Sequence, residues 1–305
     1  DVGMLVGRPG GGAMIPGEFA YHAPGTLQEA IGLLTRHGEE AKLLAGGQSL
    51  IPLMRFRLAQ PAHLIDIGRI DGLASIGERD GYLAIGAMTR EVDLESDAVI
   101  VDRYPILVDA SSVIADPLVR NLATVGGNVA HADPANDHPA VMLALRAEVV
   151  AEGPRGQRTI AIDDFFLDPF TTALEQDEVL VELRIPRAGA GSGGAYLKLE
   201  RKVGDYAIAG VAAHVVMNGR GGFDQVGIGL TNVGLTPIRA SEAETALRDG
   251  DGDEATLKRA GELAAQAAQP SSDSRGPADY KRAVVRTLTV RALRRAIERA
   301  NGKDL

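Results

Sequence analysis

Two short segments constrain this chain more than any other feature, because each sets a glycine pair after an apolar run. They are Ala45-Gly46-Gly47-Gln48-Ser49 and Thr124-Val125-Gly126-Gly127-Asn128, here called the first and second glycine segments. Glycine lacks a Cβ and tolerates positive φ, so successive N–H groups can converge on an anion. A single glycine pair is most often an ordinary turn. Two segments of matching pattern predict paired loops that bind a phosphate-bearing ligand.

The residues around the first glycine segment predict a strand, a loop and a helix in that order. Lys42–Ala45 reads as a short strand, and Leu50–Arg57 fits a helix that tolerates Pro52 in its first turn. This order can place an anion at a helix N-terminus. Ser49 is therefore expected to donate a hydrogen bond to a phosphate oxygen or to cap the helix.

The second glycine segment is followed at once by a polar stretch, His131-Ala132-Asp133-Pro134-Ala135-Asn136-Asp137-His138-Pro139. Imidazole and carboxylate groups suit a metal ion, but their spacing here matches no zinc pattern. Asp133-Pro134 is typical of a turn, and Asp137 or His138 could cap a helix that starts at Pro139. The pattern favours capping, either alone or together with a hydrogen bond to a ligand hydroxyl. A metal-dependent hydrolase built on this stretch remains the alternative from another class.

Composition excludes several classes of protein. The 305 residues are 45% apolar, enough for two or three domains with proper cores, and the expected location is the cytoplasm. No apolar run approaches the roughly 20 residues of a membrane span. The net charge of −9, without a basic run, argues against nucleic acid. The absence of cysteine removes disulfides, thiolate nucleophiles and any iron–sulfur cluster held by this chain alone.

The periodicity predicts an α+β protein in several blocks. Residues 1–13 are expected to be a disordered extension, 14–68 and 69–188 two subdomains, 189–194 a glycine-rich linker, and 195–305 a small α+β domain. Further strands are expected over 63–67, 82–86, 148–152, 159–162, 179–185, 195–202, 208–217 and 226–233. Further helices are expected after a capping box at 26–29 with Gly38 as the stop, over 105–115 and 139–145, after a capping box at 241–244, and over 255–268 and 278–300.

Three common ligand motifs are absent from the sequence. No Gly-x-Gly-x-x-Gly lies between a strand and a helix, and Gly227-x-Gly229 falls inside a predicted strand, where it indicates close packing. No Walker loop is present, and the first glycine segment lacks the final glycine of a nucleophile elbow. Dinucleotide binding of the Rossmann type and serine hydrolysis are therefore unsupported.

Four arginines gather near the C-terminus: Arg291, Arg294, Arg295 and Arg299. With Leu293 and Ile297 on the opposite side, they predict the solvated face of an amphipathic helix. A face that docks a partner is the alternative.

Several of these segments together carry a family resemblance. Residues 45–52, residues 124–128 with 133–137, and Arg201-Lys202-Val203-Gly204-Asp205-Tyr206 resemble the FAD-binding medium subunit of molybdenum hydroxylases. This is the two-subdomain flavin fold shared with vanillyl-alcohol oxidase and xanthine dehydrogenase. Residues 14–22, 114–117 and 271–280 are most similar to the branch of that family found in aerobic carbon monoxide dehydrogenase. The resemblance extends from Met14 to the end of the chain.

The resemblance implies an FAD site and its residues. The pyrophosphate would lie between the two glycine segments, bound by Ala45, Gly46, Gly47, Gln48, Ser49 and Leu50 on one side and by Thr124, Gly126, Gly127 and Asn128 on the other. Asp137 would hydrogen-bond the ribityl chain. Lys202 and Tyr206 would lie near the isoalloxazine, with Tyr206 covering one ring face. Gln48 stands where some relatives have histidine. No catalytic residue and no metal ligand is expected in this chain.

The resemblance also implies partners. A large subunit with a molybdenum cofactor would oxidise CO with water to CO2, and a small subunit with two [2Fe-2S] clusters would relay single electrons. The FAD of this subunit would collect them and pass pairs to a quinone or another respiratory acceptor. The expected assembly is a dimer of heterotrimers, peripheral at the inner face of the cell membrane. The same role in a hydroxylase of purines, aldehydes or aromatic thioesters is the second hypothesis.

Overall fold

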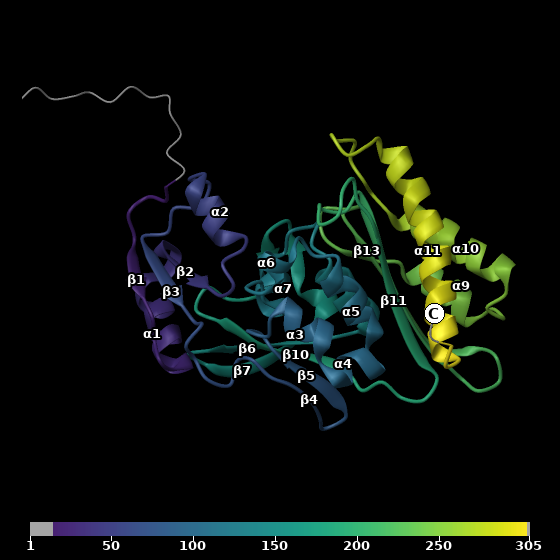
Figure 1. Ribbon diagram of the computed structural model, residues 1–305, viewed down its shortest axis with the longest axis horizontal. Helices are drawn as coiled ribbons and strands as arrows, with labels where there is room; N and C mark the ends of the chain where they lie inside the picture. The colour runs from purple at the N-terminus through teal and green to yellow at the C-terminus, as the bar shows by residue number, and fades with distance from the viewer. Residues whose placement is uncertain (1–14, 304–305) are drawn as a thin grey trace, which may run out of the picture.

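The computed structural model describes residues 15–303, so the extension predicted over 1–13 lies outside the described residues. Three larger sheets follow one another along the long axis of the molecule, and β8 and β9 form a separate two-stranded sheet (Figure 1). Their strand orders are β1-β3-β2, then β4-β5-β10-β6-β7, then β11-β12-β13-β14. Because helices lie beside each sheet and the strands are largely antiparallel, the predicted α+β class is confirmed.

The N-terminal sheet is parallel and has β3 at its centre. Its elements are β1 (Ala20–His22), α1 (Leu27–His37), the 3-10 turn η1 (Gly38–Glu40), β2 (Ala41–Leu44), α2 (Leu50–Arg55) and β3 (His63–Asp66). Thr26 caps α1 by accepting a hydrogen bond from the Glu29 backbone N–H, as its capping pattern predicts. Gly38, at φ +52°, ends the helix where the sequence predicts the stop. Apolar residues of α1 pack on Ile65 of β3.

The central sheet is antiparallel and carries most of the helices on its face. Its strands are β4 (Ile76–Arg79), β5 (Tyr82–Gly86), β6 (Glu148–Gly153), β7 (Gly156–Ala161) and β10 (Val179–Pro186). The connecting elements are α3 (Glu91–Ser96), α4 (Ala98–Arg103), α5 (Pro105–Ser112), α6 (Pro117–Arg120), α7 (Val125–His131), α8 (His138–Leu145), η2 (Ile162–Asp164), β8 (Phe166–Asp168) and β9 (Thr171–Thr172). Every residue of α8 is buried, which makes this short helix the centre of the core.

The C-terminal sheet is covered on both faces. It consists of β11 (Ser192–Leu199), β12 (Ala209–Met217), β13 (Phe223–Thr231) and β14 (Ile238–Arg239), followed by α9 (Ser241–Arg248), α10 (Glu254–Ala267) and α11 (Ala278–Ala300). The three following helices pack on one face (Figure 1). Helix α8 packs on the other, because Gly227 and Gly229 have no side chain. A Cβ at these positions would lie 1.9 Å from the Ala144 oxygen and 2.0 Å from the Ala140 oxygen.

The glycine run predicted as a linker is a connector only at its beginning. Strand β11 already starts at Ser192, and a Cβ on Gly193 would lie 2.2 Å from the Ala296 oxygen of α11. Gly194 on the opposite face contacts Ile106 of α5 in the same way, at 3.1 Å. These glycines are therefore packing positions, and composition alone could not distinguish them from a flexible run.

Two further predictions on the C-terminal helices are wrong. Helix α9 has Ala240 at its N-cap and no side-chain capping bond, so the capping box at 241–244 does not form. Glu244 is instead buried, where it accepts hydrogen bonds from the Ile228 N–H and from the Arg239 guanidinium. The arginine face is only partly solvated.

The outer arginines of that face are exposed, but the last one is tied to α5. Arg291 and Arg294 are exposed on α11. Arg299 makes a bidentate pair with Asp109, at 2.6 and 3.0 Å, and Arg295 lies 3.4 Å from the same carboxylate. The solvated face is therefore wrong for Arg299, which fastens α11 to the central region.

Candidate functional site

The two glycine segments lie against each other. A Cβ on Gly46 would lie 2.2 Å from the Leu122 oxygen, and a Cβ on Gly127 would lie 3.7 Å from the Ala45 Cβ. The residues that lead into the second segment thus cross the first at a distance that only glycine permits. Two segments that are almost eighty residues apart in sequence form one wall of backbone.

The first glycine segment is a loop between β2 and α2, as predicted. Gly47 has φ +73°, and the Gln48 side-chain amide donates to the Gly46 carbonyl at 3.0 Å. Ser49 occupies the N-cap position of α2, but its side chain makes no capping hydrogen bond. The structure therefore does not support the capping role, and the hydroxyl remains available for a ligand.

The second glycine segment is not the loop that the sequence predicts, because α7 begins at Val125 and both glycines lie in its first turn. Thr124 caps this turn by accepting from the Gly127 N–H at 3.2 Å. Ala87, which directly follows β5, crosses the helix start so closely that only glycine fits at position 126. The Gly126 N–H donates to the Ala87 oxygen at 3.0 Å, and a Cβ would lie 2.5 Å from the Ala87 Cβ. The glycines of this segment thus allow close packing and also leave backbone open to a ligand.

A cavity of about 690 Å³ opens along this wall. Its size is that of sites for drug-sized molecules, which span roughly 300–1,000 Å³. Every predicted site residue lines it except Lys202: Ala45, Gly46, Gly47, Gln48, Ser49, Leu50, Thr124, Gly126, Gly127, Asn128, Asp137 and Tyr206. Lys202 is exposed on the same loop as Tyr206 and is not part of the lining.

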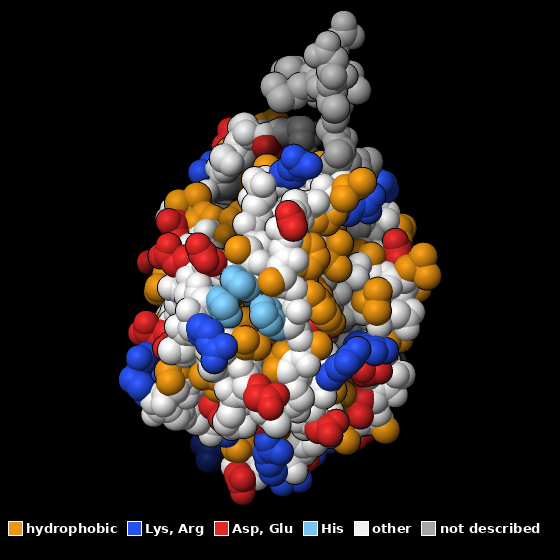
Figure 2. Space-filling model, turned by 90° about the vertical axis from the view of Figure 1, so that its left-hand side faces the viewer, with side chains coloured by type: hydrophobic (Ala, Val, Ile, Leu, Met, Phe, Trp, Pro, Cys, Tyr) orange, Lys and Arg blue, Asp and Glu red, His pale blue; other side chains and the backbone are white. Residues whose placement is uncertain are grey.

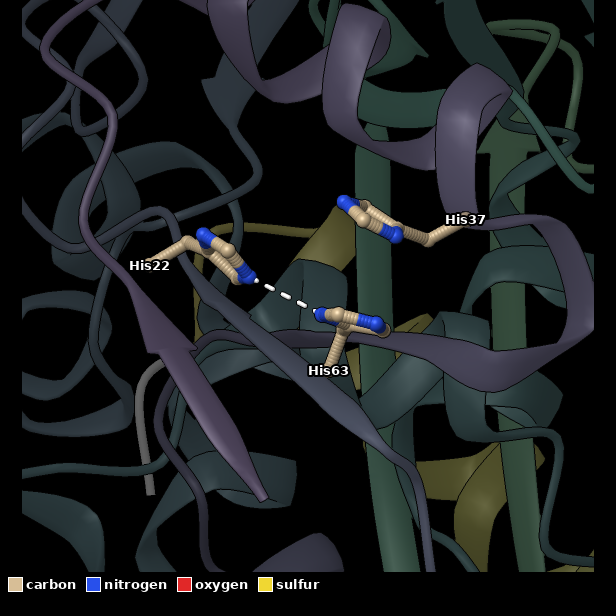
Figure 3. A group of neighbouring side chains, drawn as sticks. All are labelled: His22, His37 and His63. Carbon is tan, nitrogen blue, oxygen red and sulfur yellow. Dashed lines mark hydrogen bonds between the residues drawn. The ribbon is translucent and has the colours of Figure 1, made fainter.

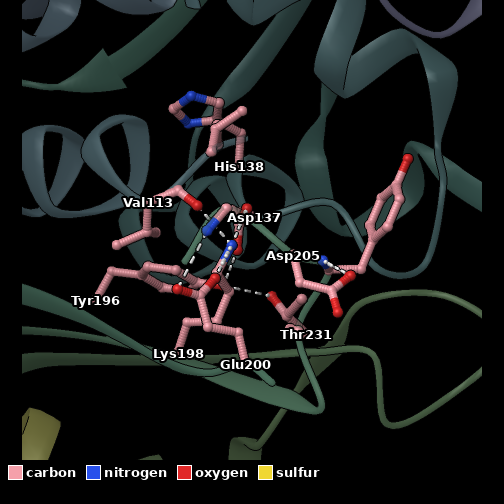
Figure 4. Close-up of polar contacts among 12 residues, drawn as sticks. Val113, Asp137, His138, Tyr196, Lys198, Glu200, Asp205 and Thr231 are labelled. Carbon is pink, nitrogen blue, oxygen red and sulfur yellow. Dashed lines mark hydrogen bonds and ion pairs between the residues drawn. The ribbon is translucent and has the colours of Figure 1, made fainter. Parts of the chain in front are cut away.

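Asp137 is buried at the end of the cavity nearest the C-terminal sheet (Figure 4). Its Oδ1 accepts from the Tyr196 hydroxyl at 2.5 Å, and its Oδ2 accepts from Lys198 Nζ at 3.2 Å. Burial raises the pKa of this carboxyl above its ordinary value, although Lys198 and Tyr196 oppose the shift. Asp137 occupies the N-cap position of α8 without a capping bond, so the predicted capping role is wrong.

Sequence reasoning missed the two partners of Asp137. Tyr196 and Lys198 alternate along β11, so both extend from one face of the strand, and Glu200 follows directly after its end (Figure 4). Lys198 is almost fully buried and also donates to the Val113 carbonyl at 2.7 Å. Burial and the Asp137 charge raise the pKa of Tyr196 well above its ordinary value, so the phenol stays protonated and donates. The alternation of Tyr196 and Lys198 in the sequence indicates that they share a face of the strand, but it does not indicate that this face meets Asp137.

Tyr206 stands at the mouth of the cavity on a loop held at two points. A Cβ on Gly204 would lie 2.3 Å from the Ala115 oxygen, so this loop touches the backbone of another lining segment. Asp205 pairs with Arg275 and Arg201, both at 3.0 Å, and these hydrogen bonds hold the pKa of Asp205 at about 2. The Tyr206 side chain itself is 47% exposed. The backbone of this loop is therefore held in place, while the Tyr206 ring is in contact with both the cavity and the solvent.

The polar stretch after α7 does not gather into a metal site. His131 lines the cavity and contacts Phe170 at a ring distance of 5.2 Å, whereas His138 is fully buried against Glu91 at 2.6 Å. Burial lowers the pKa of His138, but the Glu91 carboxylate outweighs this effect and the pKa is raised. Within residues 15–303, this stretch holds no group of three side chains placed to share a metal ion. The hydrolase alternative thus loses its basis.

Two family descriptions cover most of the chain. Residues 17–188 match the FAD binding domain in molybdopterin dehydrogenase, and residues 194–296 match the CO dehydrogenase flavoprotein C-terminal domain. The first match contains both glycine segments and Asp137, and the second contains Lys198 and Tyr206. The cavity is therefore formed by residues of both matched regions.

Known proteins resemble the chain along almost its whole length. The carbon monoxide dehydrogenase medium chain of Hydrogenophaga pseudoflava is 46% identical over 284 residues, covering 93% of this chain and 98% of that protein. The 6-hydroxypseudooxynicotine dehydrogenase complex subunit alpha of Paenarthrobacter nicotinovorans is 38% identical, covering 94% and 97%.

The fold comparison agrees with the sequence comparison. A solved structure of carbon monoxide dehydrogenase from Hydrogenophaga pseudoflava superimposes with a TM-score of 0.91 at 48% identity, covering 93% of this chain and 99% of that one. Matched families, relatives and structure all point the same way as the paired glycine segments. The chain belongs to the family of FAD-binding medium subunits of molybdenum hydroxylases.

Proposed function

We propose that this chain is the FAD-carrying electron-transfer subunit of an aerobic, molybdenum-containing carbon monoxide dehydrogenase. The observation that carries the proposal is the backbone wall formed by the two glycine segments along a cavity of about 690 Å³. Support for CO as the substrate of the complex comes from the relative at 46% identity. The reaction of CO with water to CO2 would take place on a partner subunit, so no catalytic residue is assigned here.

The residues present fit FAD. The wall needs glycine at Gly46 and Gly126 for its own packing, and it leaves backbone at the cavity surface where a diphosphate can approach. Asn128 Oδ1 is buried at this wall without a hydrogen-bond partner. An unpartnered buried acceptor is costly unless a ligand donor completes it. A ribityl or ribose hydroxyl would supply that donor.

We assign each part of FAD to a set of residues along the cavity. The diphosphate would lie between residues 45–50 and residues 124–128, with the Ser49 hydroxyl and nearby N–H groups donating to it. Asp137 would accept a hydrogen bond from a ribityl hydroxyl while it keeps its bonds to Tyr196 and Lys198. Tyr206 would cover one face of the isoalloxazine at the mouth. Lys202 would approach the ring only if its exposed side chain turned inward.

The chemistry would come from the cofactor, since a flavin accepts single electrons and releases them as a pair. The part of this chain would be to bind, orient and shield. The buried Lys198 would place a positive charge near the ring end of the cavity, and Tyr206 would limit the access of water. Neither residue needs to transfer a proton.

The proposed partners are a large subunit with the molybdenum cofactor and a small subunit with two [2Fe-2S] clusters. We expect two such heterotrimers in one complex, with a quinone or another respiratory acceptor taking the electron pairs. A quinone acceptor would place the complex at the inner face of the cell membrane without inserting this chain. Among the described residues, no helix is both long and apolar enough to cross a bilayer.

A second candidate keeps the same role but changes the substrate. The relative at 38% identity serves a dehydrogenase of a different compound, so the FAD subunit alone does not fix what its complex oxidises. Under this candidate a purine, aldehyde or aromatic thioester would be oxidised on the large subunit.

Purification of the chain with its neighbours tests both parts. We expect a complex that releases one FAD per copy of this chain on denaturation and that reduces a quinone analogue with CO but not with xanthine. A complex that releases no FAD would contradict the FAD role. A complex that releases FAD and is active with xanthine or an aldehyde but not with CO would retain that role and replace the substrate.

A further inference from the structure

Three half-buried histidines gather at the surface of the N-terminal sheet, outside the cavity lining. Figure 2 shows the pale-blue side chains side by side on this face, and Figure 3 shows how they face one another. They are His22 at the end of β1, His37 at the end of α1 and His63 at the start of β3. The chain has six histidines in all, so half of them meet at one place.

The backbone brings these side chains together. β1 and β3 are parallel, with Ala20 opposite His63 and His22 opposite Ile65, so His22 and His63 extend from the same face of the sheet. Helix α1 packs on that face through Ile65 and ends at His37, directly above the pair. Three separate elements thus deliver one imidazole each.

The distances suit a shared cation. His22 Nε2 and His63 Nδ1 are 3.1 Å apart, and one nitrogen from each ring lies within 4.8 Å of the others. Two nitrogens bound to one tetrahedral Zn²⁺, each at about 2.0–2.1 Å, lie roughly 3.3 Å apart. The His22 and His63 nitrogens are therefore already near the spacing that a shared ion requires. The His37 ring is stacked on His63 with a centroid distance of 3.7 Å, and rotation of its side chain would bring a nitrogen to the same ion.

One helix end favours positive charge beside the three rings. The C-terminal end of α1 presents carbonyl oxygens, which stabilise positive charge. Burial and the neighbouring His63 and His22 rings lower the pKa of His37. Arg36 acts in the same direction, and Glu40 acts more weakly in the opposite one.

We propose that His22, His37 and His63 form a binding site for a divalent transition-metal ion, with Zn²⁺ as the ion that this set of three imidazoles suits. Three neutral imidazoles leave one tetrahedral position open for water or for a residue of a partner. The metal would join β1 and α1 to β3, in the unit from which the first glycine segment extends. His63 pairs with Ala41, the first residue of β2, whereas the first glycine segment follows Leu44, the last residue of that strand. The metal would therefore lie at the end of β2 away from the FAD site, and its role would be structural.

The test uses the full chain in its complex, carrying no polyhistidine tag, stripped with a chelator and titrated with Zn²⁺ against a chromophoric competitor. We expect one Zn²⁺ per chain and a rise of several degrees in unfolding temperature on binding. His22→Gln, His37→Gln and His63→Gln should each weaken binding by at least about tenfold, since even loss of an outer-shell partner costs metal sites about 10- to 100-fold.

Arg36→Gln is the matched control, because it changes a charge next to His37 and removes no ligand. It should bind Zn²⁺ at least as tightly as the parent chain. FAD content and far-ultraviolet circular dichroism establish that each variant is folded. The proposal is overturned if the parent chain binds no stoichiometric Zn²⁺. It is equally overturned if a folded variant that lacks any one of the three histidines binds like the parent.

Discussion

The backbone wall of the cavity has two parts, called here the first and the second wall, which share a sequence pattern but differ in how they are built. The first wall, residues 45–50, is a half-buried loop that leaves β2 and relies on the positive φ of Gly47. The second wall, residues 124–137, starts as a capped helical turn whose Val125 and Val129 are fully buried in the main core. The first wall is a loop outside the main core, whereas the second wall is part of that core. A glycine pair therefore serves a different structural purpose in each wall.

The largest expected effect concerns the end of the second wall, where Asp137 pairs with Lys198 in a buried site. Lys198→Met should lower the free energy of unfolding by about 3–5 kcal/mol, because it leaves a buried carboxylate without its cation. The double variant Asp137→Asn with Lys198→Met should recover part of that loss. Chemical denaturation of all variants measures this, and a single variant as stable as the parent would show that the second wall is not fixed by this pair.

The next effect concerns the glycines of both walls. Gly126→Ala should lower the free energy of unfolding by about 1–3 kcal/mol, because the new methyl group meets Ala87 in a packed core. Gly46→Ala should cost at least as much, because its methyl group would lie 2.2 Å from the Leu122 oxygen, a backbone atom that cannot rotate away. Both variants should also lose FAD, since both disturb the wall. Thermal unfolding of the FAD-free proteins measures the loss, and a Gly46→Ala variant as stable as the parent would contradict the close crossing of the two segments.

A smaller effect is expected at the two residues in N-cap positions. Thr124→Ala removes a capping hydrogen bond and should cost about 1 kcal/mol. Ser49→Ala removes no such bond, so its effect on stability should stay within about 0.5 kcal/mol. If Ser49 binds a phosphate oxygen, its variant weakens FAD binding alone. Equal losses of stability in the two variants would mean that the Ser49 hydroxyl caps α2 after all.

The smallest effect is a dependence on pH at the mouth, where Asp205 anchors the Tyr206 loop beside both walls. Its pKa is lowered from 3.8 to about 2 by its arginine partners. A lowered carboxyl pKa stabilises the fold above the ordinary value, and this contribution is lost as pH falls through the folded value. The difference in unfolding temperature between the parent and Asp205→Asn should therefore stay constant down to pH 3.8 and shrink towards pH 2. A difference that vanishes already near neutral pH would contradict this assignment.

Local patterns in the sequence predicted most of the elements. Tyr82–Gly86 and Ala278–Ala300 form the strand and helix expected, because their periodicity and end signals lie within the segments themselves. Gly227 and Gly229 are packing positions inside a strand, as predicted. Such features depend on neighbours in the sequence, so one chain suffices to recognise them.

The misses share a physical cause, which is contact between distant residues. The second glycine segment lies in a helical turn that Ala87 crosses closely, and nothing near residue 126 in the sequence records that crossing. Lys198 carries no recognisable signal because its partner Asp137 lies 61 residues away. The histidine cluster carries none for the same reason, since its members are spread from residue 22 to residue 63. Composition likewise predicts a linker at glycines that pack against α11 and α5.

The bare backbone of β13 at Gly227 and Gly229 lets α8 rest on the C-terminal sheet without an intervening layer of side chains. Because the backbones of α8 and β13 are in direct contact, any rotation of that sheet would move Lys198 away from Asp137 and distort the cavity. Bound FAD would then report on the alignment of the two halves. Release of FAD before unfolding, seen as a rise in flavin fluorescence, would signal that the halves had come apart.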